Sequence, residues 1–96
     1  MITLDEAKLY MRIDGDEENN LISSLLLTAQ NIVEDVLRRP LSEFEILPET
    51  IKQAMLLAVS TLYEYRQVSK DKESFDMELL HKILLRMVGS YRIERW

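Results

Sequence analysis

Apolar residues between positions 21 and 37 recur at helical spacing. Their successive separations are 1, 3, 1, 3, 3, 1, 3 and 1 residues, which places them on one stripe of an α-helix. The stripe consists of Leu21, Ile22, Leu25, Leu26, Ala29, Ile32, Val33, Val36 and Leu37. Because Pro40 restricts the conformation of the residue before it, we expect this long helix to end near Arg39.

A shorter helix is predicted before it, from about Leu4 to Met11. Thr3 and Glu6 have the spacing of a capping box, in which the hydroxyl and the carboxylate each satisfy a backbone N–H at the helix start. An acidic turn follows, in which we expect Gly15 to adopt a positive φ and Asp16 to cap the long helix.

A second long helix is predicted to begin at Pro48, which suits a first helical position, with Glu49 in its first turn. Its main apolar face holds Ile51, Ala54, Met55, Ala58, Val59 and Leu62, and Leu56 and Leu57 widen that face. A helix that is apolar on more than one side is expected to lie centrally. The connector from Pro40 to Leu47 carries Leu41, Phe44 and Ile46 at the spacing of an extended, partly buried segment, which predicts a short strand.

A polar break from Lys70 to Ser74 precedes a fourth predicted helix, which Ser74 would cap and Gly89 would end. Its apolar stripe is Leu79, Leu80, Ile83, Leu84, Met87 and Val88. The pattern therefore predicts an all-α fold: a small bundle of about four helices with a central long helix and an extended connector before it. With 96 residues, we expect one domain over positions 1–96.

The composition argues against several classes of protein. Hydrophobic residues at 47% and charged residues at 30% indicate a folded protein rather than a disordered one. The absence of cysteine excludes disulfides, thiol catalysis and thiolate metal sites. No apolar run approaches the roughly 20 residues that a membrane-spanning helix needs, so we expect a cytosolic protein, or one assembled from a cytosolic pool, without a membrane partner.

Charge is distributed unevenly along the chain. The net charge is −5, which disfavours nonspecific DNA binding because that affinity depends on cations that neutralise phosphates. Residues 1–79 hold 8 Lys and Arg against 16 Asp and Glu, a net charge of −8, whereas residues 80–96 hold 4 against 1, a net charge of +3. An acidic body with a basic end suggests that the end docks on an acidic surface.

No catalytic or metal-binding pattern emerges. The acidic cluster at positions 14–18 fails the Ca²⁺-loop spacing, because Asn19 stands where the loop needs glycine and Leu25 where it needs a bidentate Glu. His81 is the only histidine, and neither a catalytic partner nor a ligand set is visible near it. The serines lack a nucleophile-elbow context, and the chain has no glycine-rich phosphate loop. We expect neither an enzyme nor a bound cofactor.

Two groups of residues have side chains of types that can bind other macromolecules. Arg38 and Arg39 are interpreted as helix-end cations favoured by the helix dipole, with phosphate binding as the alternative. The last six residues, 91–96, contain side-chain types that are enriched in interface hot spots, namely Tyr91, Arg92, Arg95 and Trp96. They predict an interface; the alternative is a frayed terminus.

The order of these elements resembles a known family. The segment ITLDEAKLYMRIDGDEENNLISSLLLTAQNIVEDVL, followed by LPETIKQAMLLAVSTLYEYRQ, is similar to the gp6-like head-tail connector proteins of tailed bacteriophages, often described as DNA-packaging proteins. The resemblance covers roughly Ile2 to Gln67 and rests on order and spacing. Beyond Gln67 the chain departs from the family's usual ending, since it has no proline there and continues for four residues after Tyr91 and Arg92.

The resemblance implies a structural protein of a phage or prophage virion, made in the bacterial cytoplasm and located at the head-tail junction. Such a protein would form a homo-oligomeric ring, matched to the portal and dodecamer-like, that assembles on the portal protein and binds tail or head-completion proteins. DNA would pass through the ring without sequence-specific binding. The resemblance also implies that Tyr63, Tyr65 and Arg66 are packing and subunit-contact residues. An aromatic helix end that buries its rings beside a polar tip is an equally good interpretation, and the two are compatible.

Two other classes remain open from the sequence. A helical DNA-binding regulator would need a recognition helix rich in Arg, Lys, Asn and Gln, and no predicted helix has that composition. A small helical interaction or regulatory module without catalytic activity, acting as a dimer or heterocomplex, also fits the composition.

Overall fold

The computed structural model describes residues 2–68 and 77–91. The helices α1 to α4 and two short 3₁₀ helices, η1 and η3, occupy these ranges, and they are α1 (Leu4–Met11), α2 (Asn19–Leu37), η1 (Leu41–Glu43), α3 (Glu49–Val68), α4 (Met77–Val88) and η3 (Gly89–Tyr91). No strand occurs within the described ranges. The prediction of an all-α bundle with two long and two shorter helices is confirmed.

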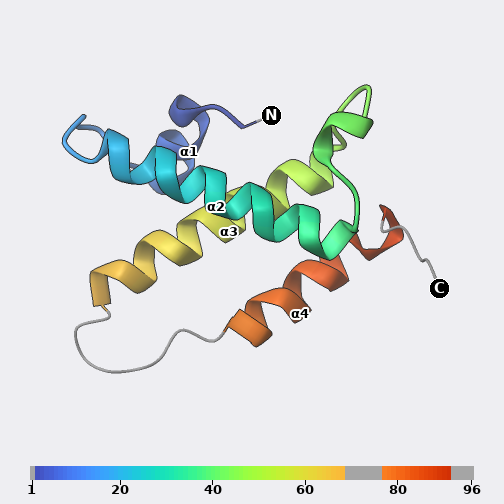
Figure 1. Cartoon of the computed structure of the whole chain (residues 1–96). Helices are drawn as coiled ribbons and strands as arrows, with labels where there is room; N and C mark the ends of the chain where they lie inside the picture. Colours follow the sequence, from blue (N-terminus) through green and yellow to red (C-terminus); the bar gives the residue numbers. More distant parts are fainter. Residues whose placement is uncertain (1, 69–76, 92–96) are drawn as a thin grey trace.

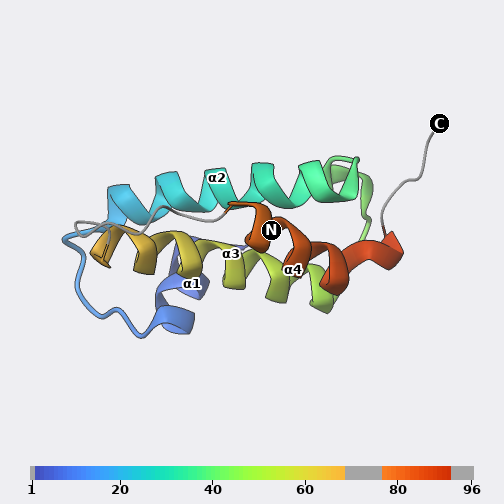
Figure 2. The same ribbon diagram turned by 90° about the horizontal axis from the view of Figure 1, so that it is seen from below.

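The helices form a flat arrangement. In Figure 1, α1 and α4 lie on opposite sides of α3, and α2 crosses over α3. Figure 2 shows α2 on one side of the molecule and the other three helices on the opposite side. Both α1 and α4 pack against α2 and against α3, and the Cα atoms span 41 × 30 × 16 Å. The two short helices therefore occupy opposite edges of a thin molecule.

The core lies between α2 and the layer formed by the other helices. From α2 it receives the most deeply buried part of the predicted stripe. From α3 it receives the predicted main face except Leu62, which is partly buried. The helix α4 contributes three residues at four-residue intervals. These fully or nearly fully buried residues are Ile22, Ala29, Val33, Val36 and Leu37 of α2, Ile51, Ala54, Met55, Ala58 and Val59 of α3, and Leu80, Leu84 and Val88 of α4. Since α3 contacts α1, α2 and α4, its broad apolar face has partners on several sides.

The start of α1 agrees with the capping prediction. The Thr3 N–H donates to Glu6 Oε1 at 2.9 Å, and the Glu6 N–H donates to Thr3 Oγ1 at 3.1 Å. The bond from the Thr3 backbone lowers the pKa of the Glu6 carboxyl. These two bonds satisfy donors that the helix start would otherwise leave open.

The turn between α1 and α2 differs from its prediction. Gly15 does not adopt a positive φ; the left-handed residues are Arg12 and Arg38, each at φ 61° and each just after a helix. Asp16 does not act as the helix cap either, because α2 begins at Asn19 and its N-cap, Glu18, makes no side-chain capping bond. The physical reason is that the Asp16 carboxylate binds Lys8 instead.

The predicted strand in the connector is wrong. Leu41 begins the 3₁₀ helix η1 and is 3% exposed, whereas Ile46 is 85% exposed. The Leu41 N–H donates to Glu34 Oε2 of α2 at 2.8 Å, so a side chain rather than a neighbouring strand satisfies the backbone here. Pro48 lies one residue before α3, and its carbonyl accepts from the N–H groups of Ile51 and Lys52 at 3.1 Å.

Fewer side chains of α4 are buried than its apolar stripe predicted. Leu79 and Ile83 belong to the predicted stripe but are 53% and 40% exposed, because α4 meets its neighbours only through the Leu80, Leu84 and Val88 side. Gly89 does not adopt a positive φ, and the chain continues directly into η3. The proposed cap, Ser74, lies outside the described residues. Within the described ranges, no helix is long and apolar enough to span a membrane.

Candidate assembly interface

Arg39 organises the junction between the end of α2, the connector and the C-terminal turn. Its Nε donates to Glu43 Oε1 at 3.1 Å, and its Nη1 donates to the Tyr91 carbonyl oxygen at 3.3 Å. The guanidinium carbon lies 4.2 Å from the centre of the Phe44 ring, a cation–π contact. Arg39 therefore links three segments of the chain, which is more than the helix-end role predicted for it.

Tyr91 completes this junction. Its ring meets the Phe44 ring edge to face, with the ring centres 6.0 Å apart and the planes at 79°. The side chain is half-buried and packs against the core. Of the predicted interface residues at the C-terminal end, Tyr91 thus has an internal packing role, while Arg92, Arg95 and Trp96 lie outside the described residues.

Tyr63, one of the aromatic residues near the end of α3, forms a second contact inside the molecule. The Tyr63 hydroxyl donates to Glu18 Oε1, which lies at the N-cap of α2. That hydrogen bond to the carboxylate, together with burial, raises the pKa of Tyr63. Tyr65 is partly buried, and Arg66 belongs to α3 with its side chain outside the described residues. Tyr63 therefore ties α3 to the start of α2, as the packing interpretation expected.

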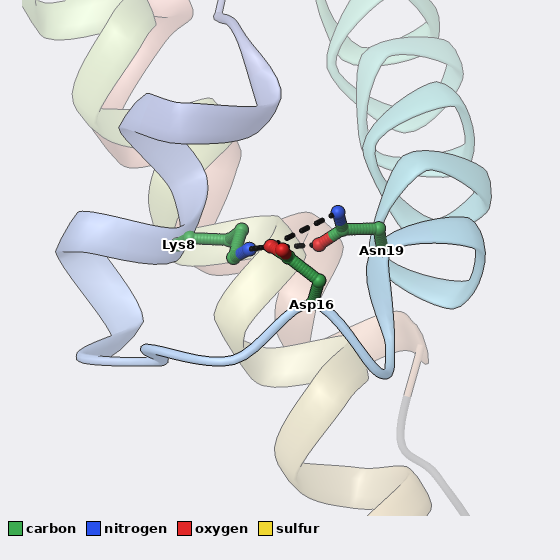
Figure 3. A network of polar contacts seen from close by, with 3 residues as sticks. All are labelled: Lys8, Asp16 and Asn19. Atoms are coloured by element: carbon green, nitrogen blue, oxygen red, sulfur yellow. Dashed lines mark hydrogen bonds and ion pairs between the residues drawn. The ribbon is translucent and has the colours of Figure 1, made fainter.

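A polar network that the sequence analysis did not identify holds α1 to the start of α2 (Figure 3). Lys8 Nζ donates to Asp16 Oδ1 and to Asn19 Oδ1, both at 2.8 Å, and Asn19 Nδ2 donates to Asp16 Oδ1 at 3.3 Å. The Lys8 side chain is 11% exposed. The hydrogen bond from Lys8 holds the pKa of the Asp16 carboxyl below its ordinary value. A spacing signal existed, because Leu4, Ala7, Lys8 and Met11 share one face of α1.

His81 lies near α2 without forming a catalytic arrangement. Its Nε2 is 3.8 Å from Asp35 Oδ2, and both side chains border a hollow between α2 and α4. Across the described part of the chain, no group of three or more His, Cys, Asp or Glu residues is placed to hold a metal ion. The available contacts here are those of a partly exposed surface pair.

The two outer helices expose large apolar side chains next to charges. On α1, Leu9 is 80% exposed and Tyr10 is 45% exposed, with the exposed carboxylates of Asp5 and Glu6 on the same face. On α4, Ile83 is 40% exposed between two exposed cations, Lys82 and Arg86. Such combinations of apolar and charged groups are suited to protein–protein contacts.

Comparison with known proteins identifies the family. The family model described as "Phage gp6-like head-tail connector protein" matches residues 1–86, from before α1 to near the end of α4. Searches of curated proteins and of solved structures gave no significant match. The match covers nearly all of the chain. It continues past Gln67, where the resemblance seen in the sequence ended, and includes most of α4. The protein therefore belongs to the phage gp6-like head-tail connector family, and its role is that of a structural phage protein.

Proposed function

We propose that the protein assembles as a ring on the portal vertex of the phage head, where it forms a channel for DNA and a docking surface for the tail. The observation that carries this proposal is the family match over residues 1–86. The fold supports it, because the outer helices expose large apolar side chains that are available for contacts with other proteins. Its partners would be further copies of itself, the portal protein, and tail or head-completion proteins.

A ring needs a heterologous contact, in which one patch on each subunit meets a different patch on the next. The flat shape of this chain, with α1 at one edge and α4 at the other, supports such a contact (Figure 1). An isologous dimer would instead bring the same patch of two subunits together.

The charge of the body supports DNA passage without retention. Residues 1–79 carry a net charge of −8, and acidic groups that face a channel would repel phosphates. The basic end of the chain has the opposite sign. We infer that Arg92, Arg95 and Trp96 contact the portal protein, since Arg and Trp are frequent hot-spot residues.

The proposal is tested by native mass spectrometry of the purified chain over a concentration series, with and without the cognate portal. We expect monomers or weakly associated species in dilute solution, and closed rings at high concentration or on the portal. Negative-stain electron microscopy of the same samples would identify the rings. A stable dimer as the sole species, with no binding to the portal, would contradict the proposal and favour a small helical interaction module.

A further inference from the structure

We propose that neighbouring subunits of the ring contact each other through the exposed faces of α1 and α4, packed antiparallel. This inference rests on the proposed ring and adds to it the two surfaces that meet. The occupant of each face is a second copy of this chain. The argument depends on which side chains these helices leave exposed, on their charges and on the positions of the two helices in the molecule.

The exposed face of α1 is acidic and apolar. Asp5, Glu6, Leu9 and Tyr10 all lie on the side away from the buried Ala7 and Lys8. Asp5 makes no ion pair or side-chain hydrogen bond within residues 2–68 and 77–91. Leu9, at 80% exposure, is among the most exposed large apolar side chains of the described residues. An apolar pair is thus available beside an uncompensated carboxylate.

The exposed face of α4 is basic and apolar. Lys82, Ile83 and Arg86 are separated by one, three and four residues, so they share the side of α4 opposite the buried Leu80 and Leu84. Neither Lys82 nor Arg86 forms an ion pair or a side-chain hydrogen bond with the described part of the chain. This face therefore carries the charge opposite to that of the α1 face, around an apolar residue of its own.

The charges along the two helices also favour antiparallel over parallel packing. Along α1, acidic groups at Asp5 and Glu6 come first and Arg12 follows the helix; along α4, Glu78 comes first and Arg86 lies in the last turn. Antiparallel packing places Asp5 opposite Arg86 and Arg12 opposite Glu78. The separations agree, because seven and eight helical residues span about 10 and 12 Å. Leu9 and Tyr10 then lie opposite Ile83, near the middle of the contact.

The two faces cannot satisfy each other within one subunit. In Figure 1, α1 and α4 lie on opposite sides of α3, and both pack inward on α2 and α3, so α3 separates the two helices within one subunit. Two unlike, complementary faces on opposite edges generate a head-to-tail contact, which closes into a ring when the rotation between subunits permits it.

Charge reversal of single residues tests the contact. We expect Asp5→Lys and Arg86→Glu, each alone, to lower the association constant of ring formation by at least about tenfold, because each places like charges together. An equimolar mixture of the two variants should regain most of the lost association, since every contact in an alternating ring again pairs opposite charges. Glu45→Lys is the matched control for Asp5→Lys: it makes the same change of charge in the connector and should leave association unchanged. Circular dichroism would establish that each variant is folded.

A cross-linking experiment tests separately whether the α1 and α4 faces lie close together. Because the chain contains no cysteine, one cysteine can be introduced on each face while the rest of the surface stays native. Chains with Leu9→Cys and chains with Ile83→Cys, mixed and treated with a short bis-maleimide, should give cross-linked dimers well above those from Leu9→Cys mixed with Ile46→Cys. If wild-type rings form while the reversed variants assemble normally and these cross-links are absent, the α1–α4 contact is wrong and the ring stands. If the wild type never assembles, alone or on the portal, the ring and this contact both fail.

Discussion

Lys8 illustrates how a single charged residue is placed by its neighbours. Its aliphatic part lies on the buried face of α1, and its ammonium group is held by Asp16 and Asn19 across the turn. A nearly buried ammonium needs such partners, because leaving it unpaired would cost several kcal/mol. The same contact keeps Asp16 from capping α2, so Lys8 contributes to the attachment of α1 and leaves the start of α2 without a side-chain cap.

The Lys8–Asp16 contact predicts a dependence of stability on pH. The pKa of Asp16 is lowered in the folded protein from its ordinary value of 3.8. Its contribution to stability is therefore fully present above that value and is lost as the pH falls through the lower, folded pKa. We expect Asp16→Asn to unfold at a lower temperature than the wild type at neutral pH, and the difference to disappear in acid, once the pH lies below the folded pKa of Asp16.

The effect should be modest, because the Asp16 side chain is 86% exposed. Thermal unfolding followed by circular dichroism across the pH range measures it. Asp14→Asn is the control, since Asp14 is exposed and makes no ion pair with the described residues. An equal loss for both variants, or a difference that grows in acid, would show that the Lys8 contact does not stabilise α1.

At the scale of elements, burial is decided by which side of a helix meets a neighbour. All six predicted stripe positions of α4 are apolar, but Leu80, Leu84 and Val88 are buried while Leu79 and Ile83 are not. A helix at the edge of a flat molecule has neighbours on one side only, so a stripe wider than that side is left partly exposed. In our proposal, the exposed Ile83 is the part of the stripe that a second subunit covers.

Because some leucines are buried and others are exposed, the same Leu→Ala substitution should lower the free energy of unfolding by different amounts at different positions. Leu80→Ala, at a position 3% exposed, should lower the free energy of unfolding by about 2 to 5 kcal/mol through the cavity it creates. Leu27→Ala, at a position 62% exposed, should change it by no more than about 0.5 kcal/mol. Ala58→Asp should prevent folding, because it buries a charge at a fully buried position of α3. Denaturant unfolding compares them, and similar costs for the two Leu variants would contradict the assignment of the core.

At the scale of the whole molecule, the end of η3 separates the packed body from the segment that we propose to bind the portal. Tyr91 is held by Phe44 and Arg39 and belongs to the packed body. The five residues that follow carry the basic and aromatic side chains that we propose to bind the portal. Deletion of residues 92–96 is therefore a sharper test than deletion from Tyr91, because it leaves the Arg39 junction intact.

We expect the chain lacking residues 92–96 to keep its fold and its ability to form rings at high concentration, but to assemble on the portal more slowly. The loss arises because Arg92 and Arg95 supply electrostatic steering and Trp96 supplies apolar contact area. Portal assembly by the full chain should also slow as salt rises. Light scattering measures both rates, and the full-length double variant Arg92→Ala with Arg95→Ala separates charge from length. A truncated chain that assembles on the portal at the wild-type rate would leave portal binding to the helices.

The sequence alone determined the four α-helices and the family of this protein. Helical spacing, the Thr3–Glu6 capping box and Pro48 act over a few residues, so they predict α1 to α4 and most of the core without knowledge of tertiary neighbours. The order of those elements was also sufficient for the resemblance to phage connectors, which the family match over residues 1–86 confirms. The interface roles predicted for Tyr63, Tyr65, Arg66, Tyr91, Arg92, Arg95 and Trp96 stay predictions.

Only the tertiary structure decided which contacts these elements make. The bond from Lys8 to Asp16, the bond from Arg39 to the Tyr91 carbonyl and the bond from the Leu41 N–H to Glu34 join residues 7 to 52 positions apart. It also decided that Ile46 and Ile83 are exposed despite their apolar character. The physical reason is that an apolar pattern specifies that a face should be buried, whereas the number of neighbours around each helix determines how much of that face one subunit can cover.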